Sequence, residues 1–377
     1  MKITDIRADT LSIGPTIVRV FTDGGVVGLS EIGWHDPAMF VPHLERVIKP
    51  MLIGEDPLQP ERHWERLYHG THERPYPTPV WYIGAIDIAL WDIVGKVAGL
   101  PLHALLGGAA RTTIPLYWST GNGGDRTPEQ MLTVTRAGWD QGFRAFKIRM
   151  DWGPLRIDAD PAKDRAMVRL CSESLPPGTW LGFDANRGYS VSTAIRQGRV
   201  LEELGVAHFE EPLPSHDRPG VRTVAAALDI PVSTGENEHD VWGFRDLIAL
   251  GDPGILQPDI LDAGGITEVR RIFQLAAVHG KPVMPHSPAT GILLAASTQL
   301  YATVATAIQP HELSTEYGPT PEQLAELLGP SVLPHDGTIT LSDAPGLGLS
   351  LDEGVLERFL GPVDPGAFAM TRPRDLA

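Results

Sequence analysis

The chain has 377 residues, of which 42% are hydrophobic and 21% are charged, so we expect a well-buried globular protein with one large or two moderate domains. Its net charge of −16 argues against binding to nucleic acid or to an anionic membrane surface, because both require clustered Lys and Arg. The single cysteine, Cys171, excludes an internal disulfide framework and indicates a reducing compartment.

The N-terminal region is expected to form an α+β domain over residues 1–113. Its first residues, MKITDIRADT, mix charges into the segment, which predicts no secretory signal and a cytoplasmic location. Residues 16–33 place β-branched and aromatic residues on both sides of Asp-Gly-Gly, which predicts a β-hairpin. An amphipathic helix follows and stops at Gly99 and Pro101. Its apolar positions are Ile83, Ile86, Leu90, Ile93 and Val97.

From Ile114 onward, short apolar strands alternate with helical stretches, which predicts a parallel sheet closed into a barrel over residues 114–330. Thr127, Pro128 and Gln130 are typical of a helix start, so residues 121–125 are interpreted as a turn and not as a phosphate-binding loop. The expected strands are 114–119, 145–150, 180–186, 206–212, 231–236, 255–260, 282–287 and 311–316.

Two further segments bear on the organisation of the chain. Residues 291–308 are apolar but carry several Ser, Thr and Gln side chains, which favours a buried helix over a membrane span. Residues 331–377 return to a hairpin-like composition, and we expect this segment to pack back on the N-terminal domain.

Carboxylates stand at the ends of three consecutive predicted strands. The steps from Asp184 to Glu210 and from Glu210 to Glu236 are both 26 residues, one strand-helix unit, so the three side chains are expected at one level of the barrel rim. Each carboxylate alone would be interpreted as a solvated rim residue. Together they would repel one another unless a cation bound them, and ligation by oxygen alone favours Mg²⁺, Mn²⁺ or Ca²⁺ over zinc.

The remaining strand ends supply candidate acid and base groups. Asp259 and His286 end the next two strands, so a carboxylate beside an imidazole predicts a general base, although a lone histidine is more often structural. Glu316 follows the eighth strand. Lys147 and Arg149 lie on one face of the second strand because side chains alternate with period two.

These residues lie in the motifs "FDAN", "FEEP", "TGEN", "QPDI", "MPHS" and "STEY", and the chain also contains "ALWDIVGKVAGLPLHALLGG". The set resembles the enolase superfamily, mandelate racemase subgroup. The resemblance implies an α/β fold, a modified (β/α)7β TIM barrel with an α+β capping domain. It also implies Mg²⁺ on Asp184, Glu210 and Glu236, and a small-molecule carboxylate substrate. Homo-oligomers, commonly octamers, are frequent in the family.

By the same resemblance, His286 with Asp259 would be an acid/base dyad that abstracts the proton α to a carboxylate, giving a metal-stabilised enediolate. Glu316 would hydrogen-bond the substrate carboxylate, and Lys147 and Arg149 would be the cations of the second strand. The family usually has Lys-x-Lys there, and an arginine in the second position is a poor base. Racemisation needs an acid and a base on opposite faces, so this substitution favours a dehydratase.

The resulting hypothesis is a dehydratase of a sugar acid, an aldonate or aldarate, that yields a 2-keto-3-deoxy acid. Asn186 stands where some sugar-acid dehydratases carry the histidine that protonates the leaving group, so it is expected only to orient a hydroxyl and disfavours a D-galactonate-type enzyme. The alternatives are a racemase or epimerase of a 2-hydroxy acid and a non-catalytic metal-binding barrel.

Loops of the predicted cap and of the second strand are candidates for shaping the pocket. The short link 11–16 predicts an open pocket, and residues 151–161 form either a pocket wall or a surface insertion. Five residues of the other cap loops are candidates for contacts with the substrate, and an ordinary surface position is an equally good interpretation of each. These residues are Trp34, His35, His72, Glu73 and Arg74.

Overall fold

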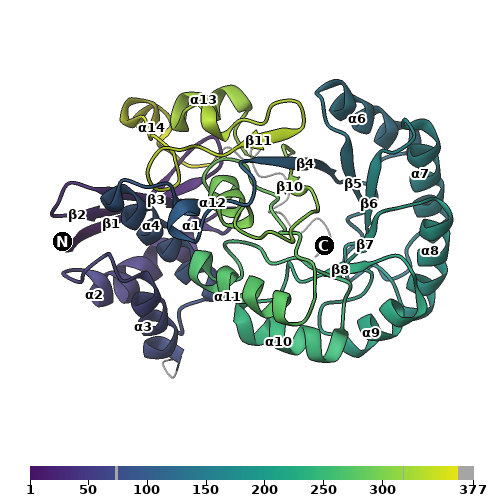
Figure 1. Ribbon diagram of the computed structural model, residues 1–377, viewed down its shortest axis with the longest axis horizontal. Helices are drawn as coiled ribbons and strands as arrows, with labels where there is room; N and C mark the ends of the chain where they lie inside the picture. Colours follow the sequence, from purple (N-terminus) through teal and green to yellow (C-terminus); the bar gives the residue numbers. More distant parts are fainter. Residues whose placement is uncertain (73–74, 317, 364–377) are drawn as a thin grey trace.

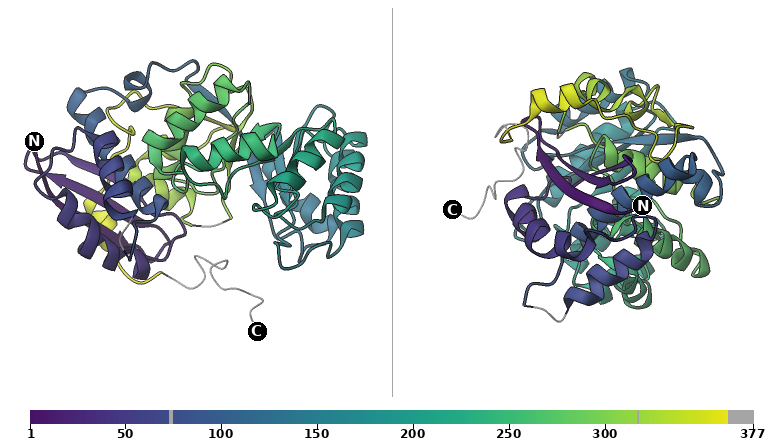
Figure 2. Two further views of the ribbon diagram at one scale, coloured as in Figure 1. Left: turned by 90° about the horizontal axis from the view of Figure 1, so that it is seen from below. Right: turned by 90° about the vertical axis from the view of Figure 1, so that its left-hand side faces the viewer.

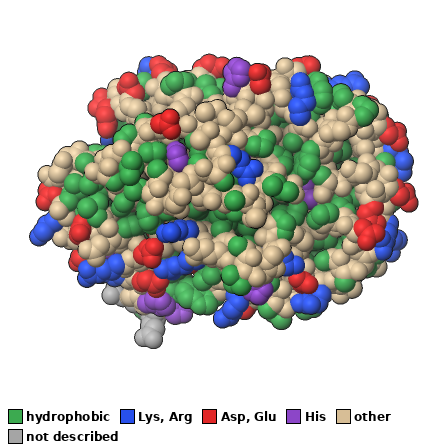
Figure 3. All heavy atoms as spheres, in the orientation of Figure 1, with side chains coloured by type: hydrophobic (Ala, Val, Ile, Leu, Met, Phe, Trp, Pro, Cys, Tyr) green, Lys and Arg blue, Asp and Glu red, His purple; other side chains and the backbone are tan. Residues whose placement is uncertain are grey.

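The computed structural model describes residues 1–72, 75–316 and 318–363. It has two parts that lie at opposite ends of the longest axis (Figures 1 and 2). One is an α+β cap around an antiparallel sheet, and the other is a parallel barrel surrounded by helices. On the face shown in Figure 3, acidic and basic side chains are interspersed, and no continuous basic stripe is visible there.

The cap sheet consists of β1 (Ile3–Thr10), β2 (Thr16–Thr22) and β3 (Val27–Glu31), in that order. The predicted hairpin is formed by β2 and β3, which join at Asp-Gly-Gly. Glycine is required at Gly28, since a Cβ there would lie 2.1 Å from the carbonyl oxygen of Ala89 on the facing helix. The cap helices are α1 (Pro37–His43), η1 (Leu44–Ile48), α2 (Lys49–Leu52), α3 (Pro60–His72) and α4 (Val80–Ala98).

Helix α4 is the amphipathic helix that the sequence predicts. It ends at Gly99, which adopts the left-handed conformation with φ 66°, and the short α5 (Leu102–Leu105) follows Pro101. One side of α4 packs on β3 and the other on the barrel helix α11 (Gly265–Val278), so α4 joins the two parts of the molecule.

The barrel strands are parallel and follow the order β10-β4-β5-β6-β7-β8-β9. They are β4 (Thr113–Thr120), β5 (Ala145–Arg149), β6 (Trp180–Asp184), β7 (His208–Glu210), β8 (Val232–Thr234), β9 (Ile255–Leu256) and β10 (His311–Leu313). The strand predicted over 282–287 is wrong in extent, because it is reduced to an isolated bridge between Val283 and Leu256. Pro282 and Pro285 lack the N–H groups that a longer ladder needs.

Helices surround the strands on the outside of the barrel (Figure 1). The capping box predicted at Thr127 and Gln130 is present at the start of α6 (Pro128–Asp140). The predicted apolar helix is α12 (Ile292–Tyr301), and it is buried along its whole length. In the part of the chain that the structure describes, no helix combines the length and apolarity that a membrane span requires. The other helices are α7 (Pro161–Ser174), α8 (Val191–Glu203), α9 (Arg218–Ala227), α10 (Asp240–Gly251), α13 (Pro321–Leu328) and η2 (Pro330–Val332).

The C-terminal segment touches both parts of the molecule. The hairpin-like composition corresponds to a tight turn in which His335 bridges Thr338 antiparallel. The strand that follows, β11 (Thr338–Thr340), pairs antiparallel with the first residues of β4, which precede those that β10 and β5 pair with. The segment also contacts the cap. The N–H of Leu347 donates to Asp92, and Glu353 on α14 (Glu353–Phe359) lies 2.7 Å from Arg19 of β2.

A buried carboxyl fixes α4 against the barrel. Asp87 is 2% exposed and accepts hydrogen bonds from the N–H and the hydroxyl of Thr267, at 2.9 and 2.6 Å. Burial raises the pKa of Asp87 to about 7, while the hydrogen bonds from Thr267 lower it. The junction between cap and barrel therefore contains an acid that folding tends to keep protonated.

We expect the stability of the protein to depend on pH through Asp87. A carboxyl whose pKa is raised by folding binds more protons in the folded state, so the contribution of Asp87 to stability is largest below about pH 4 and is lost as the pH rises toward 7. The shift corresponds to about 4 kcal/mol at most. Thermal unfolding of the wild type and Asp87→Asn between pH 5 and pH 8 should give a shallower decline for the variant. Identical declines would contradict this role.

Candidate active site

A cavity of about 430 Å³ opens between the cap and the carboxyl ends of the barrel strands. The cap contributes Pro15, Glu31, Gly33 and Trp34 to its walls. Six of the predicted site residues line it, namely Lys147, Arg149, Asp184, Asn186, Glu236 and His286. Three more, Glu210, Asp259 and Glu316, lie behind these residues and contact them directly. The structure thus brings the residues predicted from the strand ends into one site.

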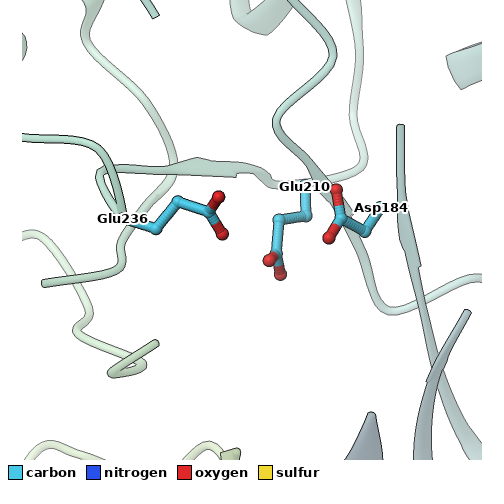
Figure 4. A group of neighbouring side chains, drawn as sticks. All are labelled: Asp184, Glu210 and Glu236. Atoms are coloured by element: carbon cyan, nitrogen blue, oxygen red, sulfur yellow. The ribbon is translucent and has the colours of Figure 1, made fainter. Parts of the chain in front are cut away.

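The three predicted metal ligands converge (Figure 4). Each offers one carboxylate oxygen, and these oxygens lie within 4.8 Å of one another. Adjacent strands cause this, because Asp184 and Glu210 are register partners on β6 and β7, and Glu236 follows β8 directly. Asp184 Oδ2 is buried and has no hydrogen-bond partner. A compact set of carboxylate oxygens with a buried, unsatisfied member fits a hard divalent cation such as Mg²⁺.

Lys147 is the buried cation next to this trio. Its ammonium lies 2.5 Å from Glu210, 2.9 Å from Glu312 and 3.6 Å from Asp184. Burial and repulsion from Glu210 raise the pKa of Asp184 well above its usual value. Burial would also raise the pKa of Glu210, but Lys147, His208 and Gln257 together outweigh it and the pKa is lowered. Lys147 thus offsets part of the negative charge, and an uncompensated part stays at Asp184.

Glu312 is a site residue that the sequence analysis did not select. It accepts a hydrogen bond from the Ser287 N–H at 2.8 Å and pairs with Lys147. Burial alone would raise the pKa of Glu312, but Lys147 and His286 lower it to about 2. The signal was present, because Glu312 and Glu316 are four positions apart and would share one face of the strand expected over 311–316.

The predicted dyad is assembled next to the trio. His286 Nδ1 lies 3.0 Å from Asp259 Oδ2, and His286 Nε2 lies 3.3 Å from Glu236 Oε2. The other Asp259 oxygen accepts the N–H groups of Leu261 and Asp262, which fixes the carboxylate. Burial lowers the pKa of His286, but Glu236 and Asp259 outweigh it and raise the pKa to about 10. Asp259 is thus placed to orient the imidazole, with Nε2 directed toward the carboxylate trio.

Arg149 has different partners from Lys147, although both are on β5. Its Nε lies 2.5 Å from Asp151 and its Nη2 lies 3.4 Å from Glu316. Glu316 also accepts the Gly121 N–H at 2.9 Å and lies 3.4 Å from Arg126. Asp151 and Arg126 were not selected from the sequence, because each lies in a loop whose direction local patterns do not define.

Asn186 lines the cavity beside Asp184. Its backbone N–H donates to Asp184 Oδ1 at 2.7 Å, so the short segment after β6 orients the carboxylate through a local turn. The neighbouring Arg187 also lines the cavity and lies 3.3 Å from Glu211. Arg187 was likewise missed by the sequence analysis.

The candidate loop residues divide into two groups. Trp34, Pro15 of the link 11–16 and Asp151 of the loop 151–161 line the cavity. His35 instead pairs with Asp262 at 2.7 Å and stacks on Trp81, and His72 is an exposed residue at the end of α3. Glu73 and Arg74 lie outside the described residues.

Comparisons with known proteins agree with this architecture. The family description "Enolase C-terminal domain-like" matches residues 130–355. The N-terminal domain of mandelate racemase and muconate lactonizing enzyme matches residues 10–107. D-galactarolactone cycloisomerase from Agrobacterium fabrum is 32% identical over 93% of this chain and 92% of its own length. The chain belongs to the mandelate racemase/muconate lactonizing enzyme family. The resemblance noted in the sequence and the predicted fold class are therefore confirmed.

Two other members of this family are informative. D-galactonate dehydratase from Verminephrobacter eiseniae is 31% identical over 95% of this chain and 94% of its own length. A mandelate racemase/muconate lactonizing protein from Paracoccus denitrificans, solved in complex with magnesium, is 34% identical. Its TM-score is 0.87, and the match covers 95% of this chain and 96% of that one. The protein is thus an enzyme of the enolase superfamily, and the relatives support a function of the sugar-acid dehydratase type.

Proposed function

We propose that the protein is a Mg²⁺-dependent dehydratase that removes the β-hydroxyl of a sugar acid and gives a 2-keto-3-deoxy acid. The observation that carries the proposal is the contrast between the two sides of the site. His286 is oriented by Asp259 and directed toward the carboxylate trio, whereas the second cationic position of β5 is an arginine that pairs with Asp151 and Glu316.

Asp184, Glu210 and Glu236 would hold the cation, which would stabilise the negative charge that develops on the substrate carboxylate when the α proton leaves. Lys147 and Arg149 would add positive charge close to that carboxylate, since both line the cavity. Preorganised charges of this kind commonly contribute about 10²–10³ in rate each.

His286 would perform both proton transfers. With its charge neutralised by a cation, Glu236 would no longer raise the pKa of His286, and the imidazole would be neutral. Its Nε2 takes the proton from the carbon next to the carboxylate, while Asp259 accepts the hydrogen bond from Nδ1–H and stabilises the imidazolium. The imidazolium then returns the proton to the departing β-hydroxyl, so the C–O bond breaks and water leaves. The resulting enol becomes the 2-keto acid. Asn186 has no titratable proton and would only orient a hydroxyl.

Two alternatives within the enzyme class remain testable. A racemase or epimerase would need a second group to exchange protons on the opposite face, and a guanidinium with a pKa above about 12 is unsuited to this. A cycloisomerase of a sugar-acid lactone is the second candidate, favoured by the 32% identity to D-galactarolactone cycloisomerase. It would share the α-proton abstraction but expel a ring oxygen in place of hydroxide.

The deciding experiment is a screen of sugar acids and their lactones with the Mg²⁺-loaded enzyme in D₂O. A 2-keto product from an open-chain acid supports the dehydratase, and product from lactones alone supports the cycloisomerase. Exchange of the α proton for deuterium without loss of water would identify a racemase or epimerase and overturn the proposal.

Replacing Arg149 by lysine should lower kcat/KM by about 10–100-fold. A single ammonium cannot span both Asp151 and Glu316, whose carboxylates would then be only partly neutralised. The rate is measured on the substrate found in the screen. Arg199→Lys, at a side chain that is 52% exposed on α8, is the matched control and should leave the rate unchanged. An unaltered rate for Arg149→Lys would show that Arg149 does not contribute to the reaction.

A further inference from the structure

The cap places one acidic side chain in the wall of the cavity. Glu31 is the last residue of β3, pairs in register with Ile17 of β2, and is 5% exposed. Its Oε1 accepts a long hydrogen bond of 3.4 Å from the N–H of Leu293, in the first turn of α12. A Cβ added at Gly291 would lie 3.9 Å from Oε2. Glu31 therefore lies where cap and barrel meet at the cavity.

Glu31 lacks the counter-charge that the other buried acids of the site have. Burial raises the pKa of Glu31 to about 8 and outweighs the hydrogen bond from the Leu293 N–H, which lowers it. Its carboxyl is therefore mostly protonated at neutral pH, and it can donate a hydrogen bond as well as accept one.

The cations that line the cavity all come from the barrel and are already paired. Lys147 contacts Glu210 and Glu312, Arg149 contacts Asp151 and Glu316, and Arg187 lies 3.3 Å from Glu211. Among the described residues that the cap contributes to the cavity wall there is no Lys or Arg. The cap side thus offers one neutral polar group, Glu31, next to the apolar surfaces of Pro15 and Trp34.

We propose that Glu31 binds a hydroxyl at the end of the substrate remote from its carboxylate and thereby selects monocarboxylic sugar acids over dicarboxylic ones. This inference rests on the proposed function, and it decides between the aldonates and aldarates that the sequence leaves open. A hydroxyl can exchange hydrogen bonds with a carboxyl, whereas a second carboxylate at the cap wall would meet an acid and, among the described residues of that wall, no Lys or Arg. Apolar walls at Trp34 and Pro15 suit the C–H faces of a sugar chain.

The test measures binding separately from turnover. Calorimetry with the Mg²⁺-loaded His286→Asn variant, which should bind without reacting, compares aldonates with the aldarates of the same configuration, for example D-gluconate with D-glucarate and D-galactonate with galactarate. We expect the best-bound aldonate to bind at least about 100-fold more tightly than its aldarate. An aldarate that binds as tightly as its aldonate would overturn the inference.

Substitutions at Glu31 in the same background test the residue itself. Glu31→Leu should weaken aldonate binding by about 10–100-fold, because the hydroxyl loses its partner in a buried site. Glu31→Gln keeps a neutral donor and acceptor, and should bind within about threefold of the parent. Glu268→Leu is the matched control, since burial also raises the pKa of Glu268 to about 8 but the residue is not part of the cavity wall.

Thermal unfolding and Mg²⁺ binding verify that each variant is folded. Unchanged aldonate affinity in a folded Glu31→Leu variant would contradict the inference. If the leucine variant does not fold, the aldonate preference of the parent and the affinity of Glu31→Gln still decide. Aldonates that bind but yield no 2-keto product with the wild type would refute the proposed dehydratase and leave the selection by Glu31 intact. If neither aldonates nor aldarates bind, both the proposed dehydratase and the selection by Glu31 are refuted.

Discussion

Replacing His286 by asparagine should lower kcat by about 10⁴-fold while Mg²⁺ binding and the fold persist. Asparagine is similar in size to the imidazole and can still accept a hydrogen bond, but it cannot take up a proton. General acid–base catalysis contributes about 10²–10⁴ in rate, and the upper end applies because one side chain would perform both proton transfers. The measurement is the rate of 2-keto product formation from the substrate found in the screen.

Asp259→Asn should have a smaller effect, about 10–100-fold, because the imidazole remains but loses the carboxylate that orients it and stabilises its protonated form. His335→Asn is the matched control for His286→Asn and should leave the rate unchanged. It also lies beside an aspartate, at 3.2 Å from Asp336, but its side chain is 89% exposed and remote from the cavity. Full turnover by His286→Asn would show that another group is the base.

Removing the divalent cation should abolish turnover, by more than about 10³-fold, without unfolding the barrel. The three carboxylate oxygens within 4.8 Å would lose the charge that neutralises them, and the substrate carboxylate would lose its main electrostatic partner. The hydrophobic core does not depend on the cation, so the far-UV circular dichroism should persist in excess EDTA. An undiminished rate in EDTA would contradict the metal site.

Binding of the cation at this site should also raise the thermal stability of the protein. A cation at 100 times its Kd stabilises the folded state by about 2.7 kcal/mol, so the thermal midpoint should rise with Mg²⁺ concentration. Asp184→Asn should remove most of this rise, because it replaces one of the three carboxylates that converge at the site by a neutral amide. Glu173→Gln, at a side chain that is 62% exposed on α7, should retain it. A midpoint that does not respond to Mg²⁺ in the wild type would count against binding at the trio.

Much of the fold was predictable because its signals are local. The Asp-Gly-Gly turn, the apolar positions of α4 and the cap at Thr127 depend only on residues close in sequence, and all three predictions agree with the structure. The prediction over 282–287 was wrong for a local reason that was visible, since prolines at 282 and 285 remove ladder donors.

The sequence by itself also determined which polar residues meet, because steps of about one strand-helix unit place the ends of successive strands at one rim. Asp184, Glu210, Glu236, Asp259 and His286 follow this rule. It did not determine how charges pair within the rim. Arg149 and Glu316 are 167 residues apart, and only the closed barrel brings them together.

Only the tertiary structure decided which side chains complete the cavity. Glu31 ends a cap strand and has no sequence relation to the barrel rim, yet cap packing against α12 places it in the wall of the cavity. Within the barrel, Glu312 of β10 pairs with Lys147 of β5, and β4 lies between these two strands. The physical reason is that a strand-helix repeat defines where each strand ends within the barrel. A contact between cap and barrel depends instead on how the surfaces of these two parts pack against each other.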